Sequence, residues 1–129
     1  MKPLLATGLL LLAAANTIAL AQQAGIRRTE LQRHAISVPG HAVVQARVEL
    51  DPGAAIPRHT HPGEELGYVL EGTLELRIDG QPPLTLAPGQ AFLVPAGLVH
   101  SARNVGAGGG AALVTYIVEQ DKPLAVPAR

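Results

Sequence analysis

The feature that most limits what this chain can fold into is an alternation of apolar and polar residues that glycine and proline repeatedly break. Apolar side chains take every second position in residues 44–50 (VQARVEL), and residues 73–79 (TLELRID) repeat the pattern. A period of two is typical of strands with one buried face. Pro-Gly and Asp-Gly pairs separate these segments, and no helical period is present from Ile26 onward. The chain is therefore predicted to be all-β, either a sandwich or a barrel, which periodicity alone does not distinguish.

Shorter segments complete this prediction. We expect further strands at residues 66–70, 84–86, 91–94 and 113–118. The glycine run at 108–110 should form a hairpin loop, because the Lys-Ser/Thr pair of a phosphate-binding loop does not follow it. Residues 22–25 are predicted to be a frayed leader. Residues 121–129 contain two prolines and are expected either to wrap the surface or to contribute to a dimer contact.

Residues 1–21 are predicted to be a secretory signal peptide. Lys2 precedes an apolar run, Leu4–Ala15, and Ala19-Leu20-Ala21 fits the small-x-small pattern of a cleavage site. The alternative is a membrane anchor, but Asn16 and Thr17 interrupt the apolar stretch and no basic cluster follows it at once. We expect cleavage after Ala21, no stable membrane span after cleavage, and a periplasmic or secreted protein.

Residues 22–129 suffice for one domain with one core but not for two. The chain balances 10 Lys and Arg against 10 Asp and Glu, and loss of Lys2 would change this by a single charge. No basic cluster is longer than Arg27-Arg28, which argues against nucleic acid as a partner. Because the chain has no cysteine, its metal ligands would have to be histidines or carboxylates.

His59, His61 and Glu65 form the most informative polar cluster. Residues two apart on a strand point to the same face, so the two imidazoles would project into one volume. Glu65 keeps that parity if the strand resumes after the bend at Pro62-Gly63. Two imidazoles and a carboxylate suit Fe(II), Mn, Ni, Cu or Zn. We therefore predict a site for one divalent metal ion, which His100 would complete from another strand.

Glu64 is the competing carboxylate. It is adjacent to Glu65 and so faces the opposite side of a regular strand, which favours Glu65 as the ligand. A shift of register at Gly63 would exchange the two roles.

A second stretch, residues 89–104 (GQAFLVPAGLVHSARN), supports the placement of His100. Its glycines permit tight turns, and Pro95 fixes the chain before a corner. Asn104 suits either an ordinary loop or a hydrogen bond that braces the strand carrying His100.

Together the two stretches resemble the two motifs of the cupin superfamily. The first reads Gly, five residues, His-x-His, three residues, Glu, six residues, Gly, at Gly53, His59, His61, Glu65 and Gly72. The second reads Gly, five residues, Pro-x-Gly, two residues, His, three residues, Asn, at Gly89, Pro95, Gly97, His100 and Asn104. Every signature position is filled. The chain looks most like the small single-domain cupins grouped with quercetin-dioxygenase-like proteins.

This resemblance implies that residues 22–129 form a conical double-stranded β-helix, or jelly roll, with a metal-binding core at 53–104. It implies that the metal is held by His59, His61, Glu65 and His100. The family includes dioxygenases, isomerases, decarboxylases, lyases and ligand sensors, so the fold does not fix the reaction.

The alternation of inward and outward positions along the strands also predicts which residues line the pocket beside the metal. Gly67 should face the interior, as Glu65 does, and leave space beside the metal, while Phe92 could add an apolar wall. Tyr68 is expected on the outer face, although it could donate to a substrate. Arg58 flanks the histidines, where it either steers an anionic ligand or is a solvated strand end.

The leading functional hypothesis is an exported, metal-dependent oxygenase that acts on a small organic molecule, with Glu65 alternating between ligand and general base. An isomerase or lyase using the same site is one alternative, and a non-catalytic small-molecule binder is another. The scarcity of aromatic residues argues against a flat aromatic substrate. Apolar outward positions such as Leu66 and Leu70 permit a homodimer.

Overall fold

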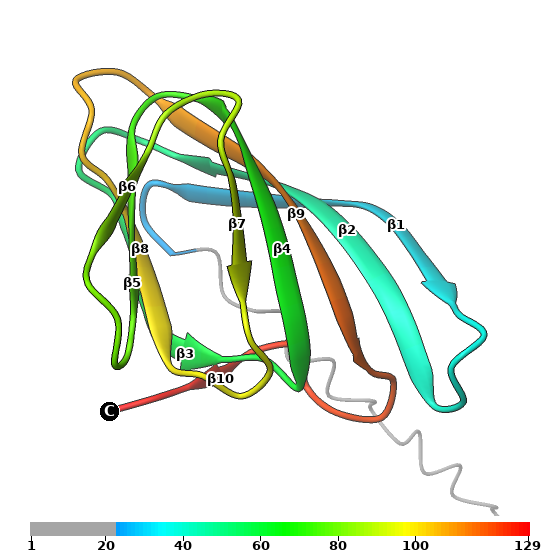
Figure 1. Ribbon diagram of the computed structural model, residues 1–129. Coiled ribbons are helices and arrows are strands. Elements are labelled where there is room, and N and C mark those ends of the chain that lie inside the picture. Colours follow the sequence, from blue (N-terminus) through cyan, green and yellow to red (C-terminus); the bar gives the residue numbers. More distant parts are fainter. Residues whose placement is uncertain (1–22) are drawn as a thin grey trace, which may run out of the picture.

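Two antiparallel sheets that face each other make up the fold (Figure 1). The structure is a computed structural model that describes residues 23–129, so the predicted signal peptide lies outside it. Its strands are β1 (Ile26–Ala35), β2 (His41–Leu50), β3 (Ala55–Thr60), β4 (Gly63–Glu71), β5 (Leu74–Ile78), β6 (Leu84–Leu86), β7 (Ala91–Val94), β8 (His100–Asn104), β9 (Gly110–Glu119) and β10 (Val126–Pro127). Residues 23–129 contain no helix that is long and apolar enough to cross a membrane.

The strand order identifies the architecture as a jelly roll. One sheet has the order β1-β2-β9-β4-β7 and the other the order β10-β3-β8-β5-β6. Strands far apart in the sequence lie side by side, since β2 pairs with β9 and β3 with β8. Such an arrangement of antiparallel strands in two facing sheets is typical of a jelly roll. The prediction of an all-β jelly roll is therefore confirmed.

The core lies between the sheets and follows the period-two pattern. In β2 every second side chain is buried, from Ala42 to Leu50, and β5 buries Leu74, Leu76 and Ile78 in the same way. β1 and β10 were not predicted as strands, and β3 was predicted only as the strand that carries His59. In β1 only Ile26 is fully buried, so this strand shows no alternation for the sequence to reveal.

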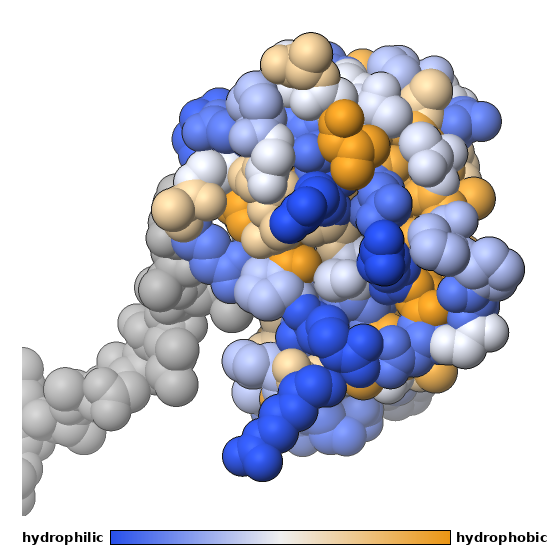
Figure 2. Space-filling view, turned by 90° about the vertical axis from the view of Figure 1, so that its left-hand side faces the viewer, coloured by the Kyte–Doolittle hydropathy of each residue, from blue (hydrophilic) through white to orange (hydrophobic). Residues whose placement is uncertain are grey.

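The outer face of the second sheet is charged. Arg58, on β3, makes two hydrogen bonds of 2.8 Å with the Asp79 carboxylate, and Arg77 pairs with Glu75 on β5 at 2.6 Å. Figure 2 shows the side of the molecule on which this sheet lies, with hydrophilic side chains spread between small apolar groups. Arg58 is thus an exposed residue paired with Asp79, which agrees with the solvated strand end predicted as one of its two roles.

Both ends of the described chain are fixed to the sheets. The Gly25 carbonyl accepts a hydrogen bond of 2.8 Å from the Asp51 amide, so the prediction of a frayed leader is wrong at this residue. At the other end, β10 pairs with β3 and places Pro127 opposite His59. Of the two roles predicted for residues 121–129, wrapping the surface is the one observed.

Four motif glycines lie in turns or bends, as predicted for Gly89 and Gly97. Gly53, Gly72, Gly89 and Gly97 have φ values of 74°, 74°, 88° and 73°. This left-handed region disfavours other residues. At Gly72 the packing adds a second requirement, because an added Cβ would lie 2.5 Å from the Gly109 carbonyl oxygen.

Asn104, at the end of β8, is a bracing residue. Its side chain is 1% exposed and donates hydrogen bonds to the carbonyls of Leu50 at 3.0 Å and Gly108 at 2.8 Å. Its Oδ1 accepts the Gly106 amide at 3.0 Å. The side chain therefore joins the end of β2 to the loop before β9, and the bracing role predicted for it is confirmed.

We expect Asn104→Ala to lower the free energy of unfolding by about 1–3 kcal/mol, because it leaves buried backbone groups without partners. Urea denaturation would measure this. Arg103→Ala, at the exposed neighbouring position, is the matched control and should change stability by less than about 0.5 kcal/mol. Equal losses in the two variants would contradict the bracing role.

Candidate metal centre

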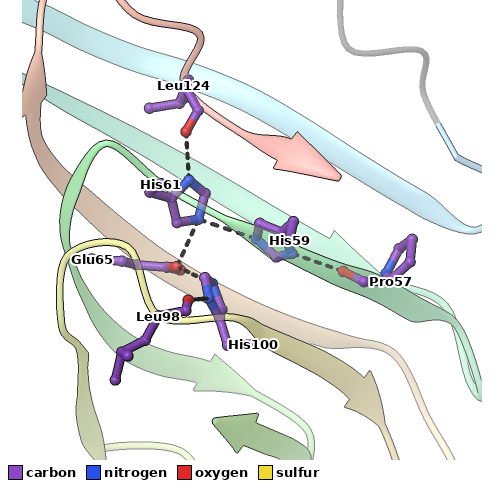
Figure 3. A network of polar contacts seen from close by, with 7 residues as sticks. All are labelled: Pro57, His59, His61, Glu65, Leu98, His100 and Leu124. Carbon is purple, nitrogen blue, oxygen red and sulfur yellow. Dashed lines mark hydrogen bonds and ion pairs between the residues drawn. The ribbon is translucent and has the colours of Figure 1, made fainter. Parts of the chain in front are cut away.

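Four polar side chains converge at one end of the space between the sheets. His59 lies on β3, His61 in the bend that follows it, Glu65 on β4 and His100 at the start of β8. One ligand atom from each lies within 4.8 Å of the other three, so the four could hold a metal ion (Figure 3). The structure thus brings together all four residues predicted from the sequence.

The strand register explains this convergence. His59 and His100 are directly opposite each other on β3 and β8, which belong to the second sheet. Glu65 comes from the first sheet, where it lies opposite Tyr116 on one side and Val94 on the other. The cluster therefore joins the two sheets.

Backbone carbonyls orient all three imidazoles. His59 Nδ1 lies 2.7 Å from the Pro57 carbonyl oxygen, His61 Nδ1 lies 2.6 Å from that of Leu124, and His100 Nδ1 lies 2.9 Å from that of Leu98. A carbonyl accepts but cannot donate, so each Nδ1 carries the proton. Each Nε2 is then left to point its lone pair into the cluster, an orientation usual for histidines that bind metals.

The Nε2 atoms face one another and the carboxylate at short range. His59 Nε2 is 3.1 Å from His61 Nε2, and Glu65 Oε2 lies 3.1 Å from His61 Nε2 and 3.0 Å from His100 Nε2. Lone pairs so close repel each other unless a positive charge lies among them. A proton or a divalent cation supplies that charge, and the donor set of imidazoles and carboxylate suits a transition metal.

Burial and neighbouring charges set the protonation of the cluster. Burial lowers the pKa of His59 to about 4, which leaves this ring neutral near pH 7. Burial alone would raise the pKa of Glu65, but hydrogen bonds and positive charge from His100 and His61, in their doubly protonated form, together outweigh it and lower the pKa to about 2. Burial alone would lower the pKa of His100, whereas its hydrogen bond with Glu65 raises it. Glu65 is therefore an anion at physiological pH.

A cavity of about 40 Å³ adjoins the cluster. His59, Glu65 and His100 line it, whereas His61 does not. The remaining wall is largely apolar and includes the side chains Val48, Leu50, Ile56, Leu74, Leu76, Phe92, Ala102, Ala112 and Val114. A ligand in this cavity would meet the cluster on its His59, Glu65 and His100 side.

One pocket prediction needs correction. Gly67 faces the interior as predicted, but the ring of Phe92 fills the space above it instead of leaving that space open. A Cβ added at Gly67 would lie 2.0 Å from Phe92 Cζ. Phe92 lines the cavity as predicted, and its ring position makes the cavity smaller.

Two other predictions about side-chain orientation are confirmed. Glu64 is exposed, whereas Glu65 is 7% exposed and belongs to the cluster. Tyr68 is 47% exposed and faces outward.

Sequence reasoning missed two parts of the site. Tyr116 is 1% exposed, and its ring centroid lies 4.7 Å from that of His61. The other is the carbonyl of Leu124, which orients His61 from the C-terminal segment. Residues 113–118 are apolar on both faces, so their pattern did not mark Tyr116 as inward, and a backbone carbonyl has no counterpart in sequence patterns.

Comparison with known proteins agrees with this geometry. Residues 46–117 match the cupin domain, which is more than half of the chain. The chain belongs to the cupin family. Germin-like protein 1 of Brassica napus is 39% identical over 82 residues, which are 60% of this chain and 40% of that protein. The dimethylsulfoniopropionate lyase DddQ of Ruegeria pomeroyi is 38% identical over 57 residues, 44% of this chain and 28% of the lyase.

Solved structures show the same relationship. An oxalate oxidase superposes with a TM-score of 0.66 at 28% identity, covering 91% of this cupin and 61% of the oxidase. The DddQ lyase superposes with a TM-score of 0.61 at 29% identity, covering 67% of this chain and 43% of the lyase. The chain spans between 37% and 40% of the length of the first curated relatives.

If the cluster holds a metal, Glu65→Ala should lower the metal content at least tenfold, because it removes the anionic donor. Losses of about 10- to 100-fold follow even from changes to the groups that support metal ligands. Elemental analysis of the purified protein measures this. Glu64→Ala is the matched control and should keep the wild-type content, since Glu64 faces solvent. Retention of metal by Glu65→Ala would contradict the site.

Proposed function

We propose that this cupin is a metal-dependent enzyme of the oxygenase type that acts on a small organic molecule. The observation that carries the proposal is the cluster of four converging donor atoms beside an apolar cavity. A binding site for a metal alone would need no cavity next to it. Here the cavity gives a second molecule access to three of the four residues, which is what a metal-dependent reaction requires.

Under this proposal His59, His61, Glu65 and His100 hold one divalent metal ion, whose identity among Fe, Mn, Ni, Zn and Cu the donor set does not fix. Bound there, the ion would supply Lewis-acid or redox chemistry. The carbonyl contacts of the three imidazoles support this role, because they fix the rings before any ion arrives. Such preorganisation lowers the cost of assembling the site.

Two ionisable side chains are suited to proton transfer. We also propose that Glu65 acts as a general base: its pKa of about 2 leaves it deprotonated near pH 7, as a proton acceptor must be, although so low a pKa makes it a weak base. Burial, together with the charge of Glu65, raises the pKa of Tyr116, so its phenol keeps its proton. Tyr116 lines the cavity and could donate a hydrogen bond to a bound molecule. The apolar walls exclude water from both groups.

A lyase or isomerase is the second candidate. The resemblance to the DddQ lyase favours it, and a general base beside a Lewis acid would serve it equally well. The resemblance to an oxalate oxidase, which extends over 91% of this chain, favours the oxygenase type. A binder without turnover would use the same cluster and cavity.

Reconstitution with Fe(II), Mn(II), Ni(II) or Zn(II) under anaerobic conditions, followed by addition of oxygen and a panel of small organic molecules, separates these candidates. We expect oxygen uptake that depends on both metal and substrate, and that Glu65→Ala abolishes. Product formation without oxygen uptake would favour the lyase or isomerase. Saturable binding without product in every metal form would contradict an enzyme.

We also propose that the chain forms a homodimer through the outer faces of β4 and β7. Leu66 and Leu93 lie directly opposite each other there at 44% and 54% exposure, and Tyr68 is beside them. A dimer would remove this apolar surface from water. We expect light scattering to give twice the chain mass for the wild type and the single chain mass for Leu93→Glu. A monomeric wild type would contradict the dimer.

Export remains a prediction that rests on residues 1–21. N-terminal sequencing of the mature protein tests the cleavage expected after Ala21.

A further inference from the structure

Arg28 places a cationic side chain in the wall of the cavity beside the metal cluster. It lies on β1 directly opposite Val48, whose buried side chain points into the core. Opposite residues on paired strands share a face, so Arg28 also points inward. It lines the same cavity as His59, Glu65, His100 and Tyr116. Sequence reasoning noted Arg28 only as part of the Arg27-Arg28 pair.

Among residues 23–129, the guanidinium of Arg28 has no carboxylate partner, unlike several other arginines of this protein. Arg58 pairs with Asp79, Arg77 with Glu75, and Arg47 with Glu71. Within residues 23–129, Arg28 Nε is buried and makes no hydrogen bond. Leaving such a donor unpaired costs free energy, so its position needs a physical reason.

Glu65 does not supply the missing partner. It is the only carboxylate among the described residues that line the cavity, and its Oε2 already lies within 3.1 Å of two histidines. Tyr116 lies near both the Arg28 and Glu65 side chains: burial and the charge of Glu65 act to raise the pKa of its phenol, whereas the charge of Arg28 and a hydrogen bond with Arg28 act to lower it. The cavity wall thus includes both the cluster and an arginine that has no carboxylate partner among residues 23–129.

The balance of charge favours an anionic ligand. A divalent ion and Arg28 together carry three positive charges, of which Glu65 neutralises one. Two positive charges in an apolar cavity are costly unless an anion enters with them. The free volume of about 40 Å³ corresponds to roughly three water molecules, which limits the anion to a compact one.

We propose that Arg28 binds the carboxylate of a small carboxylic acid. A further oxygen of that acid, such as a hydroxyl, would face the four metal-ligating residues. Arg28 is therefore a specificity-determining residue for the substrate. Its planar guanidinium can hold a carboxylate through two parallel hydrogen bonds and satisfy the buried Nε at the same time. This inference rests on the proposed metal-dependent function and names the class of substrate for the same site.

Calorimetric titration of the Zn(II)-loaded protein tests it, since zinc has no redox chemistry that would consume the probe. The probes are glycolate and its neutral analogue of similar size, glycolamide. We expect the wild type to prefer glycolate. In Arg28→Gln the affinity for glycolate should fall by about 10- to 100-fold, because a charge-assisted hydrogen-bond pair is lost. The affinity for glycolamide should stay within about twofold.

Two variants control for other effects. Arg27→Gln removes an exposed arginine next in the chain and should leave both affinities at their wild-type values. Arg28→Lys keeps the charge without the planar fork and should recover part of the affinity for glycolate. Circular dichroism and zinc content, measured on the same samples, report whether each variant is folded and loaded.

The proposal is wrong if the zinc-loaded wild type does not prefer glycolate, or if Arg28→Gln keeps the preference. It is also wrong if Arg28→Gln lowers the affinities for glycolate and glycolamide equally, because Arg28 would then shape the pocket without pairing with the carboxylate of glycolate. These results leave the metal-dependent function intact as long as zinc binds. If the wild type takes up Mn(II) or Ni(II) but no zinc, the same titration is run with that ion; a wild type that takes up none of these ions contradicts that function, and this inference with it.

Discussion

Four electron-rich atoms held close together in an apolar interior are the constraint on which the rest of the structure depends. The imidazoles cannot turn away from one another, because a backbone carbonyl holds each Nδ1. Positive charge must therefore lie among the Nε2 atoms and the Glu65 carboxylate. Since His59 and His100 come from one sheet and Glu65 from the other, that charge also links the sheets. A metal bound only by the folded chain would stabilise it by mass action, in a protein that has no disulfides.

Those parts of the site that follow a strict period of two could be predicted from the sequence. β4 runs without irregularity from Gly63 to Val69, and its register shifts only between Val69 and Glu71. Parity along this strand therefore selected Glu65 over Glu64 and placed Tyr68 outside. The same pattern predicted the buried faces of β2 and β5, and the motif glycines predicted the turns.

The parts of the site that could not be predicted lie on strands where apolar and polar residues do not alternate. β9 has apolar side chains on both faces, so nothing marked the inward position of Tyr116. In β1, polar residues occupy almost every position and a bulge interrupts the register between Glu30 and Gln32. Parity there cannot tell whether Arg27 or Arg28 points inward. Only the pairing of β1 with β2 decides this, and pairing is a property of the tertiary fold.

Charge and size in the cavity are set by different elements, and this separation explains how one set of candidate metal ligands could serve several reactions. The cluster depends on β3, β4 and β8, which carry the two family motifs. The cation comes from β1, which lies outside them, and the size limit comes from Phe92 packed over Gly67. A change at Arg28 or Phe92 would alter which molecule fits without moving a ligand atom. Resemblance to both an oxidase and a lyase is therefore expected, because the shared motifs specify the cluster and leave the walls of the cavity free to differ.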